Sequence, residues 1–279
     1  MSIEVSNLDH LGLVAGIIDE IGIEQKINQL LGEELSEKIT GGQAVKGMLL
    51  NGLGLVSSPL YLFSKFFEGK AIEHLIGKGV KTEYFNDDKL GRVLDQLYHR
   101  GLNQIFMSVV LEAVKIYQLE TNTVHLDSTS FHVHGDYQTD DDELTEDIEP
   151  KTIKITYGYS RDKRPDLKQF MMDLICTNHG DVPLWMRIGS GNESDQKQFV
   201  QAMKGFKNQL NFDSLMVADS ALYTQENLQL LTNIRWLSRV PVRNQNDYKS
   251  ISNLTPERLE LLKFFPPSCQ RYYLVSEET

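Results

Sequence analysis

The chain has 279 residues and 41% of them are hydrophobic, which is enough for two domains with real cores. Its formal net charge of −11 is uneven, because residues 122–150 carry nine acidic side chains and no Lys or Arg, whereas residues 151–279 are net +3. The overall acidity therefore does not exclude a nucleic-acid partner. Cys176 and Cys269 are too few for a disulfide framework or a cysteine zinc site, and no signal peptide or membrane span is visible, so a cytoplasmic protein is expected.

Residues 1–121 predict an all-α domain, because apolar residues recur at helical spacing between start and stop signals. The run Asn86-Asp87-Asp88 opens one helix, which presents Arg92, Gln96 and His99 and could therefore recognise DNA. The alternative is the solvated outer face of a packing helix, and the sequence leaves both open. The other predicted helices cover residues 8–21, 23–31, 40–56 (capped by Thr40), 60–67 and 105–116.

From Thr123 the pattern changes to strands. Residues 123–135 alternate apolar and polar side chains around Asp127, and the alternation shifts by one residue in the adjoining Ser/Thr cluster, which predicts a β-bulge. A second carboxylate, Asp219, directly follows the apolar run 215–218. The remaining predicted elements are strands at 169–177, 182–188 and 235–240 and helices at 193–210 and 224–232.

This order predicts an α/β mixed-sheet domain of the RNase H-like type over residues 122–243. Its first and fourth strands can lie side by side, which would bring Asp127 and Asp219 to one edge of the sheet. Two neighbouring carboxylates repel unless a cation lies between them, and oxygen ligands suit Mg²⁺ or Mn²⁺. Such a site can activate water or a sugar hydroxyl for attack on a phosphodiester. The alternative is that each Asp only caps the turn after a buried strand.

Basic side chains near these strands are candidates for contacts with DNA phosphates. Four belong to the connector 156–168, for which a plain surface turn is the alternative, and two follow the last predicted strand, where salt bridges are the alternative. The acidic loop 136–149 is expected to be solvent-exposed rather than a metal site. The six basic candidates are Arg161, Lys163, Arg164, Lys168, Arg239 and Arg243.

Five stretches together resemble bacterial insertion-sequence transposases with a DDE catalytic core, in the branch with an N-terminal helical domain. They are NDDKLGRVLDQLYHRG (86–101), LDSTSFHVHG (126–135), GYSRDKRPDLKQ (158–169), VADSALY (217–223) and WLSRVP (236–241). The resemblance implies that Asp127 and Asp219 are the first two catalytic acids and bind Mg²⁺ or Mn²⁺. It also implies that the chain cuts transposon ends, joins them to target DNA and works as a homodimer.

The resemblance has one departure. The third acid of the family lies in a Tyr-x2-Arg-x3-Glu-x6-Lys signature, and no such pattern occurs in this sequence. Residues 244–279 are interpreted as the start of an insertion, and the late acids Glu277 and Glu278 follow a strand-like stretch instead of a basic helix. We therefore expect a catalytic domain that is incomplete at its C-terminus and a truncated chain that is deficient in strand transfer.

Two other functions stay open. A transposase remnant that binds DNA without catalysis would agree with the missing third acid. A metal-dependent hydrolase could use His132 and His134, which share one face of a strand, although the other histidines form no second cluster in the sequence.

Overall fold

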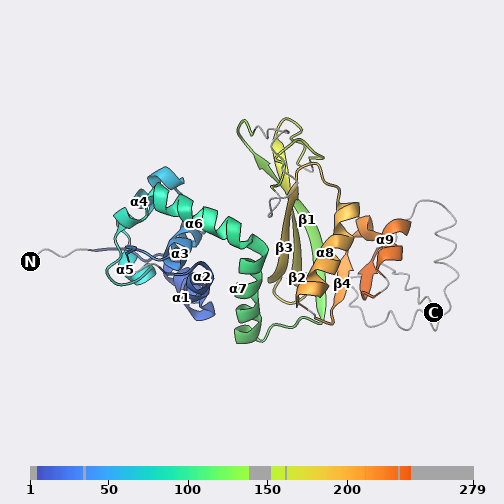
Figure 1. Ribbon diagram of the computed structural model, residues 1–279, viewed down its shortest axis with the longest axis horizontal. Coiled ribbons are helices and arrows are strands. Elements are labelled where there is room, and N and C mark those ends of the chain that lie inside the picture. Colours follow the sequence, from blue (N-terminus) through green and yellow to red (C-terminus); the bar gives the residue numbers. More distant parts are fainter. Residues whose placement is uncertain are drawn as a thin grey trace, which may run out of the picture. The chain divides into compact units, whose positions relative to one another are not determined.

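The protein is described by a computed structural model over residues 5–33, 36–137, 152–160, 162–210, 212–231 and 233–239. These residues form two compact units, one ending at Leu119 and the other beginning at Glu120 (Figure 1). The predicted start of an insertion at residue 244 lies outside the described residues. Within the described ranges, no helix is both long enough and apolar enough to cross a lipid bilayer.

The first unit is all-α, as predicted. Two of its helices begin at the expected polar caps: the Thr40 hydroxyl and the Gln43 side chain form a reciprocal capping box, and Asn86 Oδ1 accepts a hydrogen bond from Lys89 N at 2.8 Å. The helices are α1 (Leu11–Ile21), α2 (Ile23–Leu31), α3 (Gly41–Gly52), α4 (Phe63–Phe66), α5 (Ile72–Leu75), α6 (Asp87–Arg100) and α7 (Leu102–Tyr117), with 3₁₀ turns at Leu60–Leu62 and Thr82–Tyr84.

The second unit is built on a five-stranded sheet in the order β3-β2-β1-β4-β5. The pairs β1–β2 and β2–β3 are antiparallel, whereas β1–β4 and β4–β5 are parallel, so the predicted RNase H-like arrangement is confirmed. The elements are β1 (Thr123–Val133), β2 (Lys168–Thr177), β3 (Pro183–Ser190), α8 (Asp195–Leu210), β4 (Leu215–Ala218), a 3₁₀ turn (Ser220–Leu222), α9 (Gln225–Leu230) and β5 (Trp236–Ser238).

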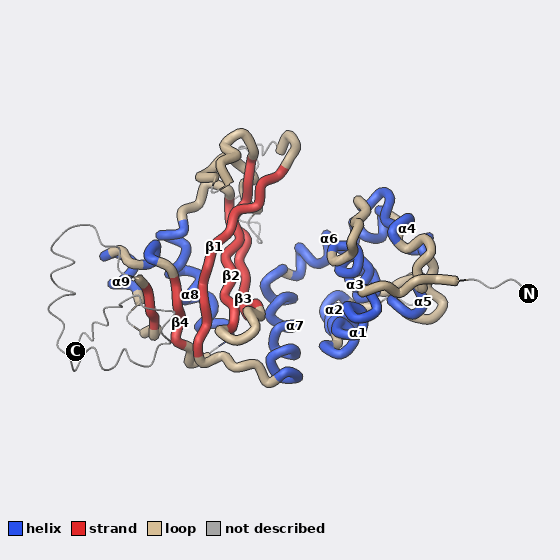
Figure 2. The backbone as a smooth tube through the Cα atoms, turned by 180° about the vertical axis from the view of Figure 1, so that it is seen from behind, coloured by secondary structure: helices blue, strands red, loops and turns tan. Residues whose placement is uncertain are grey.

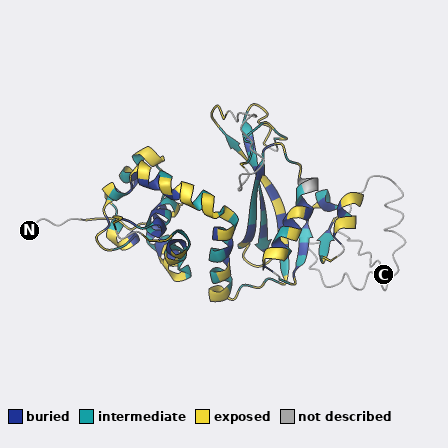
Figure 3. Ribbon diagram, viewed as in Figure 1, coloured by how far each residue is buried: buried dark blue, intermediate teal, exposed yellow. Residues whose placement is uncertain are grey.

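Helix α8 covers one face of this sheet. It lies in front of the strands in Figure 1 and behind them in the reverse view of Figure 2. Leu126, Ile175 and Met216 are buried on that face, and the Trp185 indole donates a hydrogen bond of 2.8 Å to Gln209 Oε1 on α8. Figure 3 shows exposure alternating along the strands, as expected when only one face belongs to the core.

The β-bulge predicted in the Ser/Thr cluster is wrong. Strand β1 pairs with β2 without a break, from Val124 opposite Thr177 to Val133 opposite Lys168. The hydrophobic pattern misled because a polar residue occupies the core face and an aromatic one the outer face: Ser128 is buried, while Phe131 is 42% exposed. The register shift in this part of the sheet lies instead between β2 and β3, at Ile175 and Cys176.

Candidate active site

Two acidic residues follow directly after the paired stretch of the neighbouring parallel strands β1 and β4. The last paired residues of β1 and β4 are Leu126 and Ala218, and the following residues are Asp127 and Asp219. Because Leu126 and Ala218 are buried and side chains alternate along a strand, both acids point to the opposite, open face, and both are exposed. Neighbouring strands are about 4.8 Å apart, so the backbone segments that carry the two acids are close neighbours.

Each carboxylate uses one oxygen in the local backbone structure. Asp127 Oδ1 accepts a hydrogen bond from Ser128 N at 2.8 Å, and Asp219 Oδ1 accepts one from Ala221 N at 2.8 Å, which caps the following 3₁₀ turn. Asp219 thus caps the turn after a buried strand, as the alternative interpretation predicts, but it uses only one carboxylate oxygen to do so. Within the described part of the chain, Oδ2 of either residue accepts no hydrogen bond and is available to a ligand.

Hard carboxylate oxygens with room for water are the donor set that Mg²⁺ or Mn²⁺ prefers, so the two residues fit such an ion. Across the described ranges, no three His, Cys, Asp or Glu side chains gather as one metal-binding group. The pair therefore supplies two protein ligands, and water or substrate oxygens would have to supply the others. Glu277 and Glu278, the late acids noted in the sequence, lie outside the described residues.

An open pocket of about 300 Å³ lies beside the second carboxylate, at the ends of β4 and β5. Apolar residues of the two strands line it, together with Asp219, Ser220 and Arg239. Arg239 is exposed, and its Nη2 lies 3.4 Å from Ser220 Oγ. Among the described ion pairs none involves Arg239, so this guanidinium is available to an anion next to Asp219. Arg243, its predicted companion, lies outside the described residues.

The basic connector has protein partners for two of its four cations. Arg164 donates two hydrogen bonds to Asp166, at 2.9 and 2.7 Å, and these hold the pKa of the Asp166 carboxyl at about 2. Lys168 Nζ donates to the Tyr137 carbonyl at 2.5 Å and lies 3.9 Å from Asp136 Oδ1. Arg161 lies outside the described residues, and a DNA contact by Lys163 stays a prediction.

Sequence reasoning missed a charged network on the core face of the sheet. Asp173 is 2% exposed; it accepts hydrogen bonds from the Ser128 hydroxyl and, at 2.8 Å, from Arg187 Nε. Arg187 Nη2 also donates to Glu193 Oε2 at 2.7 Å. Burial alone would lower the pKa of Arg187, but its bonds to Glu193 and Asp173 raise it. Because Ser128 adjoins Asp127, the network fixes the strand that carries the first acid. The available signal was an Asp inside the apolar run 170–176.

The histidine pair considered for a hydrolase does not form a metal-type cluster in the described structure. His132 Nε2 lies 3.0 Å from Ser160 Oγ, and its Nδ1 lies 3.5 Å from Asp162 Oδ2. Both ring nitrogens of His132 thus face the connector instead of a shared site with His134.

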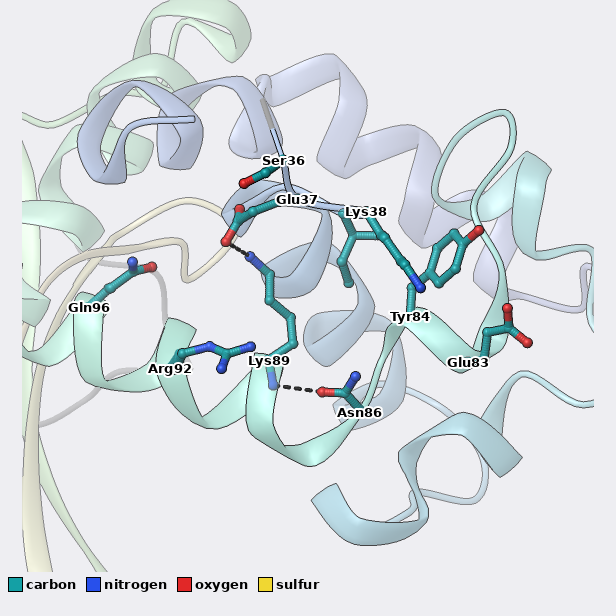
Figure 4. Close-up of a pocket in the computed structure, with 10 residues that line it drawn as sticks. Ser36, Glu37, Lys38, Glu83, Tyr84, Asn86, Lys89, Arg92 and Gln96 are labelled. Atoms are coloured by element: carbon teal, nitrogen blue, oxygen red, sulfur yellow. Dashed lines mark hydrogen bonds and ion pairs between the residues drawn. The ribbon is translucent and has the colours of Figure 1, made fainter. Parts of the chain in front are cut away.

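A larger pocket of about 420 Å³ lies in the first unit, where α6 presents its polar residues to the segments around Glu37 and Tyr84 (Figure 4). Lys89 Nζ forms an ion pair of 2.6 Å with Glu37. Arg92 and Gln96, from the candidate recognition helix, also line the pocket and are exposed. His99 is not among its lining residues. A DNA-reading role for this helix therefore stays a prediction.

Comparison with known families gives two matches. The family described as "Transposase DDE domain" matches residues 119–271, and the family described as "Domain of unknown function (DUF4277)" matches residues 3–111. No curated protein matches the chain.

Solved structures similar to the chain include three transposase complexes, all at low sequence identity. The piggyBac transposase synaptic complex with hairpin DNA has 11% identity and a TM-score of 0.40; the match covers 88% of this chain and 53% of that one. The chain thus spans about half the length of that protein. The Mos1 paired-end complex with the left transposon end has 10% identity, coverage of 83% and 72%, and a TM-score of 0.27. The Mos1 mariner complex with Mn has 10% identity, coverage of 93% and 90%, and a TM-score of 0.27.

Proposed function

Because the chain belongs to the family of transposases with a DDE domain, we propose that it acts on the DNA ends of an insertion sequence. The proposed reaction is divalent-metal-dependent cleavage of a phosphodiester at each end, followed by strand transfer into target DNA. The single observation that supports this most is the β1–β4 register, which leaves Asp127 and Asp219 side by side on the open sheet face.

In this proposal the two aspartates hold a divalent cation, Mg²⁺ or Mn²⁺, through their free Oδ2 atoms. When bound, the ion would lower the pKa of an attacking water or sugar hydroxyl and stabilise the leaving oxygen. The backbone N–H groups of Ser128 and Ala221 hold the other carboxylate oxygens, which fixes the side chains before metal arrives. Arg239, beside Asp219, would contact a phosphate of the bound DNA.

The main alternative is a DNA-binding remnant without catalysis. The described residues supply two acids, and the position of a third acid is not assigned. The two readings differ in what the acids do: in the remnant, replacing Asp127 would leave every measurable activity unchanged. We also propose that the chain acts as a homodimer on paired DNA ends. Separating the products cleaved at one end from those cleaved at both ends would test this.

The test is cleavage of a supercoiled plasmid that carries the DNA flanking the chain's own gene on both sides. With Mg²⁺, nicking should occur at the element ends, and Asp127→Asn or Asp219→Asn should lower its rate by at least about two orders of magnitude. Asp213→Asn is the matched control, because Asp213 lies just before β4 and its side chain is 93% exposed. End-specific binding without any metal-dependent nicking by the unmodified chain would favour the remnant instead.

A further inference from the structure

Two stacked aromatic rings lie on the same sheet face as the two carboxylates. Phe131 is four residues beyond Asp127 on β1, so alternation puts both side chains on the open face. Its ring stacks on that of its cross-strand partner Phe170, with centroids 5.2 Å apart and planes inclined by 12°. We propose that this ring pair is a stacking platform for a nucleobase of the DNA held at the acids; the inference rests on the proposed function.

Among the described strands, none pairs with one edge of β1 beyond Leu126. Strand β4 pairs with β1 only as far as Leu126, so from Asp127 to Val133 the described strands flank β1 on the β2 side alone. Figure 2 shows β1 and β2 running on past the end of β4. A nucleic-acid strand that runs from the acids along β1 would meet this extension, with Phe131 on its open face.

The exposure of the ring and its surroundings fit a nucleobase. Phe131 is 42% exposed, and its neighbour is an aromatic ring that keeps it in a fixed plane. Base stacking on such a ring accepts any base, because every base has a π-face. Lys168 lies two residues before Phe170 on β2 and hence on the same face, but its ammonium group is already held by the Tyr137 carbonyl and Asp136, so the proposal rests on the rings alone.

The spacing between Asp127 and Phe131 along β1 predicts which nucleotide stacks on the ring. Four strand residues span roughly 13 Å at about 3.3 Å each, which is roughly four base steps of duplex DNA at 3.4 Å. The stacked base should therefore lie within about four nucleotides of the phosphodiester held by Asp127. If the DNA strand is stretched, fewer nucleotides separate the two.

The first experiment measures binding of single-stranded 20-mers that carry one 2-aminopurine at successive positions, with Ca²⁺ replacing Mg²⁺ to prevent cleavage. Phe131→Leu should weaken binding about 10-fold and abolish fluorescence quenching at one position, whereas Phe131→Tyr should restore both. Tyr117→Leu is the matched control, because Tyr117 is an aromatic residue at the end of α7 whose exposure of 42% equals that of Phe131. Equal binding and quenching by folded Phe131→Leu and the unmodified chain would overturn the proposal.

A second measurement needs no substitution. In the unmodified chain, a 5-iodouracil placed at the quenched position should cross-link to the peptide that contains Phe131, and cross-links confined to other peptides would overturn the platform. Failure of the platform is distinguishable from failure of the proposed function. In the first case end cleavage by the unmodified chain persists while Phe131→Leu binds normally; in the second, cleavage is absent whatever the oligonucleotides show.

Discussion

Removing the buried carboxylate of Asp173 should destabilise the second unit strongly. The side chain of Asp173 is 2% exposed and that of its partner Arg187 is 21% exposed, so Asp173→Ala strands a largely buried guanidinium. Breaking a buried ion pair on one side costs about 3–5 kcal/mol. Arg187 keeps its bond to Glu193 and some solvent contact, so we expect a smaller cost of about 2–3 kcal/mol, at or just below the lower limit of that range.

Urea denaturation followed by tryptophan fluorescence measures this effect, because Trp185 and Trp236 both belong to the second unit. With a slope of about 1–3 kcal/mol per M, the midpoint should fall by roughly 0.7–3 M. The double variant Asp173→Ala with Arg187→Met should recover part of the loss, because it removes the stranded charge.

The same fold supplies a matched control. The Arg164–Asp166 pair has comparable hydrogen-bond distances, but its side chains are 48% and 61% exposed. Asp166→Ala should therefore leave the urea midpoint unchanged within error, since exposed ion pairs contribute little to stability. If Asp173→Ala lowers the midpoint no more than Asp166→Ala does, the reasoning about the buried network is refuted.

Three further predictions concern single residues. Thr40→Ala removes the capping box of α3 and should cost about 1 kcal/mol of stability in the first unit; an unchanged far-ultraviolet circular dichroism transition would contradict it. Burial, with smaller contributions from Asp181 and Asp127, raises the pKa of the Cys176 thiol. At pH 8 the peptide that contains Cys176 should therefore be alkylated more slowly in the native chain than in the urea-unfolded chain, and the difference in rate should shrink at higher pH. Equal alkylation rates at pH 8, measured by mass spectrometry, would contradict this prediction. Gly191→Ala would place a Cβ 2.0 Å from the Gln169 carbonyl oxygen and should lower stability by about 1–3 kcal/mol, so an unaltered fluorescence midpoint would count against this close packing.

The order of elements and the meeting of the two acids could be predicted because the signals for both are local. The apolar runs before Asp127 and Asp219 mark core strands, and strand order follows from the sequence of strands and helices along the chain. The parallel β1–β4 register then leaves an acid next in each strand. The start of a helix was equally local: Asn86 caps α6 as expected.

What could not be predicted depends on contacts between distant residues. Ser128, Asp173 and Arg187 meet across three strands. The apolar alternation does not reveal that Ser128 lies on the core face, and its shift by one residue therefore led to the erroneous prediction of a bulge. The pocket in the first unit joins α6 to segments around Glu37 and Tyr84, which no local pattern connects.

The central claim is that Asp127 and Asp219 together bind one divalent cation. Titration of Mn²⁺ monitored by electron paramagnetic resonance tests it on the unmodified chain, Asp127→Asn, Asp219→Asn and the double variant. If the ion is shared, each single substitution should weaken Mn²⁺ binding by at least about 10-fold, and the double variant should lose little more, because the two effects are strongly coupled. Affinities that do not change, or losses that simply add as for two independent sites, would contradict the account.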